Sequence, residues 1–230
     1  MAETFHRQFV NFIGYKVGRD WYGLEEEAKD AAREEFEKII GMYRPPMMIR
    51  SYSTRGIRSE MDFFFWRISD SLETFDEMSS AMSHTVIGRY LSTAYSSLSM
   101  AKHLVYVNEA DPGVPEVVRS RILPGSGKYI LVHPLVRKRE FYPMPKEDRQ
   151  RIMDDYNRIV FRYKSVKFHT TYSFGLDDQD FLAVFESDKP SDLADLAAEL
   201  RESKASLYTV RDTPVVTGIQ KPLVEILAAL

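Results

Sequence analysis

The feature that most constrains the fold of this chain is a hairpin-like stretch that occurs twice. The later copy, residues 167–188, has two short apolar and aromatic runs around a Gly-Leu-Asp-Asp turn, which is typical of a β-hairpin. The earlier copy, residues 51–66, has Tyr-Ser, a glycine, a branched aliphatic residue, polar turn residues, an aspartate and an aromatic-rich run in the same order. The two turn glycines, Gly56 and Gly175, lie 119 residues apart.

A second pair of matching positions has nearly the same spacing. Trp21 and Phe141 lie 120 residues apart, and each is followed by an acidic pattern typical of a helix. Two matches at nearly the same offset predict an internal duplication, with chance similarity of two hairpins as the alternative.

The order of predicted elements is the same in both halves of the chain. The first half is predicted to form strand, helix, strand, strand, helix and strand at residues 7–17, 24–43, 47–53, 60–69, 71–82 and 102–107, with short helical turns over 84–100. The second half repeats this order at residues 128–136, 145–162, 166–172, 180–186, 191–202 and 207–219, with Ser191 as a helix N-cap.

Prolines and glycines concentrate between the halves, so residues 111–127 are predicted to be a linker between an N-terminal half, 1–110, and a C-terminal half, 128–230. Two βαββαβ units correspond to two ferredoxin-like halves. The fold class expected is therefore α+β, with two antiparallel sheets joined in a dimeric α+β barrel.

Composition excludes several classes of function. A net charge of −3 and a pI near 6.0 give no electrostatic reason to expect a nucleic-acid partner. The absence of cysteine excludes disulfides, thiolate zinc sites and a cysteine nucleophile, and no two histidines have the i, i+4 spacing of a helical metal site. No apolar run approaches the ~20 residues of a membrane span, and no signal-peptide core is present. We expect a cytoplasmic protein without a metal site.

Several motifs resemble one known family. They are residues 129–137, Phe141-Tyr142, 149–153, 173–178 with Asp180-Phe181, and 211–214, joined in the N-terminal half by Gly56, Asp62, Trp66 and 96–100. Across nearly its whole length the chain is similar to the chlorite dismutase-like superfamily, which includes the coproheme decarboxylases. The resemblance implies a dimeric α+β barrel, usually assembled as a homopentamer, with haem or coproheme in the C-terminal half.

The resemblance also shows where this chain departs from the family. Asp155 stands where the family has its proximal haem-ligating histidine, and a carboxylate is a poor substitute for that ligand. Phe168 stands where chlorite dismutases have an arginine and coproheme decarboxylases a glutamine. His133 replaces the reactive tyrosine of the decarboxylases, and Arg137 replaces a lysine. These departures argue against chlorite decomposition as the activity of this chain.

The residues expected to line the family's haem pocket are cofactor-binding candidates, and no catalytic residue is assigned. They are His133, Arg137, Tyr142, Asp155, Tyr156 and Phe168. Asp155 lies on the apolar stripe of its helix, where an unpaired carboxylate is costly. We expect it either to pair with Arg137, Arg158 or Arg162 or to reach water at the helix edge. The alternative is that it belongs to a remodelled pocket that binds something other than haem. His133 has functional and structural interpretations. Strand alternation directs His169 to the sheet face opposite to Phe168, as a structural or interface residue.

Three functions follow as hypotheses. The first is a family member with a degenerate haem site and no chlorite dismutase activity, which binds a small molecule, a porphyrin or nothing. The second is a haem- or coproheme-dependent oxidoreductase, of peroxidase or decarboxylase type, with an atypical iron ligand such as His133 or Tyr156. The third is a structural or partner-binding ring, for which Phe168 and Tyr156 are expected to fill the cavity.

Overall fold

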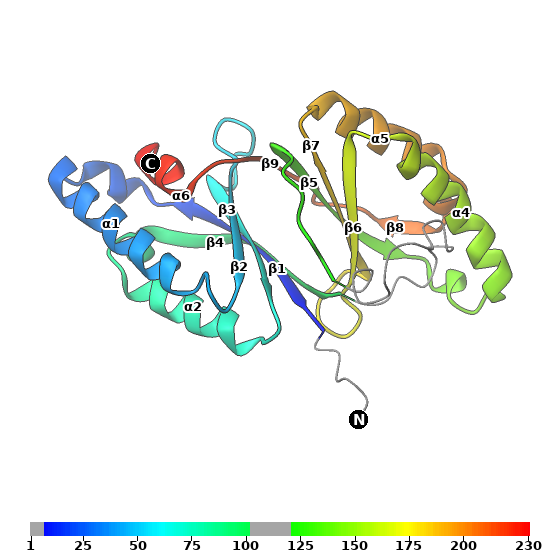
Figure 1. The fold of residues 1–230 in the computed structure, drawn as a ribbon, viewed down its shortest axis with the longest axis horizontal. Coiled ribbons are helices and arrows are strands. Elements are labelled where there is room, and N and C mark those ends of the chain that lie inside the picture. The colour runs from blue at the N-terminus through cyan, green and yellow to red at the C-terminus, as the bar shows by residue number, and fades with distance from the viewer. Residues whose placement is uncertain (1–6, 102–120) are drawn as a thin grey trace. The chain divides into compact units, whose positions relative to one another are not determined.

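The computed structural model describes residues 7–101 and 121–230, which form two compact units (Figure 1). One unit consists of residues 1–98 with 218–230, and the other consists of residues 99–217. The predicted strand 102–107 and most of the predicted linker lie outside the described residues. Both units combine helices with antiparallel sheet, so the α+β class is confirmed.

The N-terminal unit contains a three-stranded antiparallel arrangement in which β3 lies between β1 and β2. Its elements are β1 (Phe9–Val17), α1 (Glu26–Met42), β2 (Met48–Ser53), β3 (Phe63–Ser69), α2 (Glu73–His84), the first part of β4 (Leu91–Met100) and α6 (Leu223–Ala228), with 3-10 turns at Arg19–Gly23 and Ile87–Tyr90. All seven residues of β3 are buried, and the first four, residues 63–66, are aromatic.

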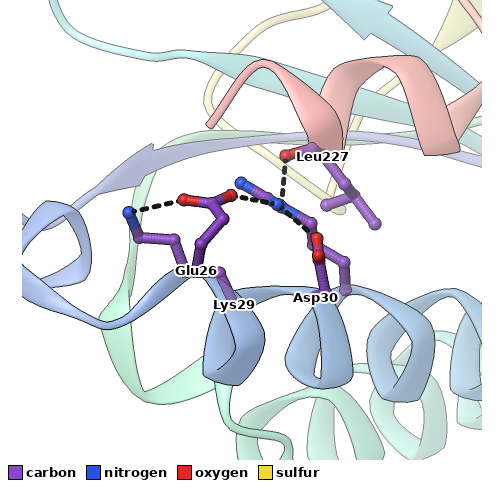
Figure 2. Close-up of polar contacts among 5 residues, drawn as sticks. Glu26, Lys29, Asp30 and Leu227 are labelled. Atoms are coloured by element: carbon purple, nitrogen blue, oxygen red, sulfur yellow. Dashed lines mark hydrogen bonds and ion pairs between the residues drawn. The ribbon is translucent and has the colours of Figure 1, made fainter.

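An arginine on α1 joins that helix to the C-terminal helix α6. The Nε atom of Arg33 donates to the carbonyl oxygen of Leu227 at 3.1 Å, and its Nη1 atom donates to Glu26 and Asp30, each at 2.7 Å. Figure 2 shows these contacts, together with the ion pair between Lys29 and Glu26. Because a helix leaves its last carbonyl groups without intrahelical partners, this bond stabilises the end of α6.

The C-terminal unit repeats the plan, with β7 between β5 and β6. Its elements are β5 (Tyr129–Arg137), α4 (Lys146–Arg162), β6 (Val166–Tyr172), β7 (Phe181–Ser187), α5 (Pro190–Glu202), β8 (Thr209–Arg211) and the start of β9 (Val216–Gln220), with 3-10 turns at Arg139–Phe141 and Lys204–Tyr208. Apolar side chains of α4 and α5 form one core with β5 and β7, including Val160, Leu196 and Phe185.

The two halves share detailed hydrogen bonds as well as element order. Strands β1 and β5 each have nine residues with the same burial pattern, and α1 and α4 each have 17 residues. The Asp62 carboxylate accepts from the backbone N of Val17 at 2.9 Å, and the Asp180 carboxylate accepts from the backbone N of Arg137 at 2.7 Å. Each aspartate therefore fixes the end of the corresponding first strand to the hairpin turn.

The turn glycines are equivalent too. Gly56 has a φ of +75° and Gly175 a φ of +73°, a left-handed conformation that residues with a Cβ rarely adopt. The equivalence of these turns agrees with the internal duplication inferred from the sequence.

Three sequence predictions about local structure are wrong. Residues 91–100 form strand β4 rather than short helical turns, because their polar side chains and backbone are bonded across the sheet, as in the bond from Thr171 to Ser99 at 2.7 Å. The predicted strand 207–219 is divided between a 3-10 turn, β8 and β9, and Pro214 in the gap has no N–H to donate to a ladder. Helix α5 begins at Pro190 with Lys189, not Ser191, at the N-cap.

Candidate functional site

Two adjoining cavities lie in the C-terminal unit, and Leu135, Arg137 and Tyr156 line both. The first has a volume of about 570 Å³ counted to its mouth, and its other lining residues are Phe141, Met153, Asn157, Phe168, Thr170, Tyr172, Phe181 and Ala183. The second has a volume of about 710 Å³, and its other lining residues are His133, Ala197, Leu200, Arg201, Ser203, Ala205, Ser206, Thr209, Val210 and Asp212. Both volumes include open space at the cavity mouths, and side chains fill most of the first cavity.

Aromatic side chains occupy the space between α4 and β6 in the first cavity. Phe168 on β6 stacks on Phe185 of β7, with ring centroids 5.0 Å apart. The ring of Tyr156 on α4 lies 6.2 Å from the ring of Phe168, at an angle of 54°. Burial raises the pKa of Tyr156 to about 12, although the charge of Arg137 opposes this shift. The phenol is therefore neutral at physiological pH.

Arg137 is a buried cation at the boundary of the two cavities. Its Nη1 atom donates to the carbonyl oxygen of Ala205 at 2.5 Å and to the hydroxyl of Thr209 at 2.8 Å. Its guanidinium carbon lies 5.7 Å from the ring centroid of Phe141, a cation–π distance. These contacts fix the guanidinium at the end of β5 and leave a positive charge inside the unit.

Tyr142 supports the site without lining either cavity. Its hydroxyl donates to the Asp180 carboxylate at 2.6 Å, the same oxygen that accepts from the backbone of Arg137. Its ring also makes an edge contact with Phe174, at 5.6 Å. Tyr142 therefore holds the strand end that carries Arg137.

Asp155 lies away from both cavities. Its side chain is one-third exposed, and it forms an ion pair with Arg158 at 3.3 Å. Its other carboxylate oxygen lies 3.4 Å from the backbone N of Lys204. It lines a separate surface depression together with Arg158, Arg162 and Glu199. The residue of α4 that faces the two main cavities is its neighbour, Tyr156.

His133 projects into the second cavity beside a carboxylate. Its Nε2 atom lies 3.5 Å from an Asp212 oxygen, and Arg201 approaches the same oxygen at 3.3 Å. Burial lowers the pKa of His133, and the nearby charge of Asp212 only partly opposes this effect. The imidazole is therefore neutral near pH 7, so it is available to gain a proton.

The prediction for His169 is confirmed. The side chain lies on the sheet face opposite to Phe168, where its Nε2 atom contacts the Glu186 carboxylate at 3.0 Å. Both side chains are buried, at 8% and 0% exposure, and Glu186 also accepts from the backbone N of Gly125. This buried pair gives His169 a structural role.

The lining residues that sequence reasoning did not assign to the site include Met153, Asn157, Arg201 and Asp212. A signal existed for two of them, because Met153 is three residues before Tyr156 on one helix and so shares its face, and Asp212 belongs to the motif 211–214. Arg201 gave no sequence signal, because its approach to Asp212 depends on tertiary packing.

Haem is the cofactor that the family resemblance suggests, and the residues do not fit it between α4 and β6 as they stand. A flat macrocycle between two rings needs roughly 7 Å, twice a carbon–carbon contact distance, whereas the centroids of Tyr156 and Phe168 are only 6.2 Å apart and the rings are tilted. The described residues lining the first cavity include two phenols, Tyr156 and Tyr172, and the thioether of Met153, which are known types of iron ligand, but no imidazole.

Two kinds of feature are absent from the described ranges. Within residues 7–101 and 121–230, no helix has the length and apolar character to cross a membrane. The same ranges contain no group of three or more histidine, cysteine, aspartate or glutamate side chains placed to hold a metal ion.

Comparison with known proteins shows the relationship of the whole chain. The sequence model of the chlorite dismutase family matches residues 29–221. The chain is 28% identical to the coproheme decarboxylase of Mycolicibacterium smegmatis over 219 residues, 94% of this chain and 88% of the relative. It is 21% identical to the chlorite dismutase of Ideonella dechloratans, covering 96% and 79% of the two chains. The solved chlorite dismutase of Candidatus Nitrospira defluvii in complex with imidazole has a TM-score of 0.86 at 26% identity, covering 96% and 94%.

Proposed function

This chain belongs to the chlorite dismutase family, and we propose that it is a ligand-binding member that neither decomposes chlorite nor holds haem through an imidazole. The ligand that suits its first cavity is a small, largely apolar molecule that does not need to pass between the rings of Tyr156 and Phe168. The cavity walls are mostly aromatic and aliphatic, and Tyr156, Asn157 and Thr170 supply polar atoms along them. Such a site recognises a ligand by shape, with a few hydrogen bonds fixing its orientation.

The observation that carries this proposal is the position of Phe168. Its ring stacks on Phe185 inside the first cavity, where a residue that retains an oxychlorine anion must supply charge or donors. A phenyl ring supplies neither. Arg137 is the one cation among the described residues lining this cavity, and its guanidinium already donates to Ala205 and Thr209.

The cavity face of α4 supports the proposal that the chain does not hold haem through an imidazole. The position expected to carry a ligating histidine, Asp155, is paired with Arg158 in a separate depression. Met153, Tyr156 and Asn157 face the cavity instead. An imidazole-ligated iron therefore has no counterpart in this part of the described chain.

Oxygen release from chlorite tests the proposal. Protein preincubated with excess haem is expected to release no more oxygen in an oxygen electrode than the same haem with serum albumin. The variant Tyr156→His, which places an imidazole on the cavity face of α4, provides a comparison. Turnover by the unmodified protein well above the albumin control contradicts the proposal.

A second candidate is a haem- or coproheme-dependent oxidoreductase with Tyr156 as the iron ligand. The favouring observation is that this phenol faces the cavity near the positive charge of Arg137, which favours its ionised form. It requires the rings of Tyr156 and Phe168 to separate. Saturable coproheme binding whose spectrum changes in Tyr156→Phe, but not in Tyr142→Phe, would favour this candidate over the first.

Self-association is a further part of the proposal, with the homopentamer as the assembly expected from the family. Leu207 and Val210 expose 66% and 65% of their surface in the single chain, and apolar side chains of this kind are often covered in an assembly. Light scattering coupled to size exclusion tests this, since a monomeric mass at micromolar concentration contradicts it.

A further inference from the structure

We propose that the second cavity binds a monocarboxylate with a small apolar body, and that binding draws a proton onto His133. The inference goes beyond the proposed function and does not depend on what occupies the first cavity. It begins from the cluster of His133, Arg201 and Asp212, in which one Asp212 oxygen lies 3.5 Å from the imidazole and 3.3 Å from the guanidinium. All three side chains line a cavity of about 710 Å³.

The cluster contains a polar atom whose surroundings point to a ligand. The Nε2 atom of His133 is buried and makes no hydrogen bond of normal geometry with any described residue. Its contact with Asp212, at 3.5 Å, has only an ion-pair distance. The His133 side chain is 91% buried, given its 9% exposure, so bulk water does not compensate for the missing bond. A ligand oxygen in the cavity would satisfy it.

The charge balance of the cavity selects an anion. The charged side chains among its described lining residues are Arg137, Arg201 and Asp212, two cations and one anion. His133 is neutral because burial lowers its pKa, and Tyr156 is neutral because burial raises its pKa to about 12. These described residues therefore carry one net positive charge, which a single negative charge on a ligand would neutralise.

The donors and walls select a carboxylate with an apolar body. Ser206 already donates to the carbonyl oxygen of Ser203 at 2.8 Å, and the Thr209 hydroxyl donates to the carbonyl oxygen of Ala205 at 3.4 Å. The imidazole and the Arg201 guanidinium are the remaining donors at the cluster, a set that matches the two oxygens of one carboxylate. The rest of the wall is largely aliphatic, contributed by Leu135, Ala197, Leu200, Ala205 and Val210.

Proton uptake follows from the groups that face His133. These are Tyr156 on α4, Arg201 on α5, Asp212 after β8 and Arg137 on its own strand, while the residue opposite on β7 is Ala183. A ligand carboxylate beside the ring adds a second negative charge, which favours the imidazolium form. The pKa of His133 is then higher with the ligand bound than without it. At a pH between these two values the bound state holds more protons than the ligand-free state. Affinity therefore rises as the pH falls through that interval.

Isothermal titration calorimetry with benzoate, in two buffers of different ionisation enthalpy, tests the proposal on the full-length protein near pH 7. Benzoate is expected to bind saturably, and benzamide, its neutral analogue, to bind roughly tenfold more weakly or worse. The measured heat is expected to differ between buffers, which indicates proton uptake. The proposal is overturned if benzoate does not bind at millimolar concentration or binds no better than benzamide.

Variants separate the roles of the residues. His133→Gln is expected to abolish the buffer dependence, and Arg201→Gln to weaken benzoate binding about tenfold. Arg158→Gln is the matched control, because Arg158 lines a separate depression, and its affinity should equal that of the unmodified protein. If His133→Gln does not fold, Asp212→Asn is the test variant in its place. Asp212→Asn should bind benzoate several-fold more tightly than the unmodified protein, because the substitution removes a negative charge beside the site. Proton uptake that persists in folded His133→Gln, or unchanged affinity in Asp212→Asn, refutes the mechanism.

Discussion

Removal of the Asp180 carboxylate tests whether the duplicated turn holds the site in place. In Asp180→Ala the backbone N of Arg137 and the hydroxyl of Tyr142 lose an acceptor at 2.7 and 2.6 Å, respectively. Hydrogen bonds to charged groups each contribute about 1.5–3 kcal/mol. Because Asp180 is only partly buried, water will compensate for part of this loss. We expect the free energy of unfolding to fall by about 2–4 kcal/mol, part of the summed value.

The assay is urea unfolding followed by circular dichroism, together with thermal melting. For a chain of this size the melting temperature is expected to fall by roughly 5–15 °C. Asp178→Ala, an exposed neighbour in the same turn, is the control and should change stability by less than about 0.5 kcal/mol. Asp62→Ala removes the equivalent carboxylate of the first half and should cost a similar amount. If Asp180→Ala is as stable as Asp178→Ala, the clamp does not stabilise the strand end.

Three further predictions follow from the structure. Gly175→Ala places a Cβ on a residue with a φ of +73° and should destabilise the protein by about 1–2 kcal/mol in urea unfolding. The control is Gly41→Ala, in a helix with open space around it, which should stabilise the protein by about 0.5–1 kcal/mol. Arg33→Ala removes the bond to Leu227 and should speed amide hydrogen exchange in α6, with little change in α5. The raised pKa of Tyr156, about 12, means that its stabilising contribution is complete below about pH 10 and is lost as the pH rises toward 12. Tyr156→Phe should therefore remove about 2 kcal/mol of the stability loss measured between pH 9 and 11.5.

Each of these predictions has a contradicting result. Equal effects of Gly175→Ala and Gly41→Ala would mean that the turn tolerates a Cβ. Unchanged exchange in α6 of Arg33→Ala would assign the end of that helix to apolar packing alone. An alkaline stability loss that is the same with and without the Tyr156 phenol would show that the group titrates normally.

Much of the fold could be predicted because each half repeats strong local patterns. Helix α1 carries Ala32, Phe36 and Ile40 at four-residue spacing on its buried side, and the hairpin glycines have the positive φ that their turns require. Strand β4 was not predicted, because its serines and threonines have little apolar periodicity and gain order from cross-strand bonds. The split of the final strand depends on local backbone geometry near Pro214, which residue types alone do not define.

The site was predicted in part. The errors arose where a residue's position was inferred by counting along a helix or where it depends on tertiary packing. Phe168, Tyr156, Arg137 and His133 all line the cavities of the C-terminal unit. An ungapped count placed Asp155 at the ligand position, yet on α4 one residue corresponds to about 100° of rotation, enough to turn a side chain from one face to another. The positions of Asp212 and Arg201 beside His133 come from packing between segments distant in sequence, which no local pattern encodes.

The measurement that tests the central claim most directly is a titration of the purified protein with haem, followed by absorbance in the Soret region. The aromatic contact between Tyr156 and Phe168 and the absence of an imidazole among the described residues of the first cavity predict no saturable, shifted Soret band at micromolar protein. A shifted band that saturates at one haem per chain would contradict the account and show that the cavity opens to hold iron.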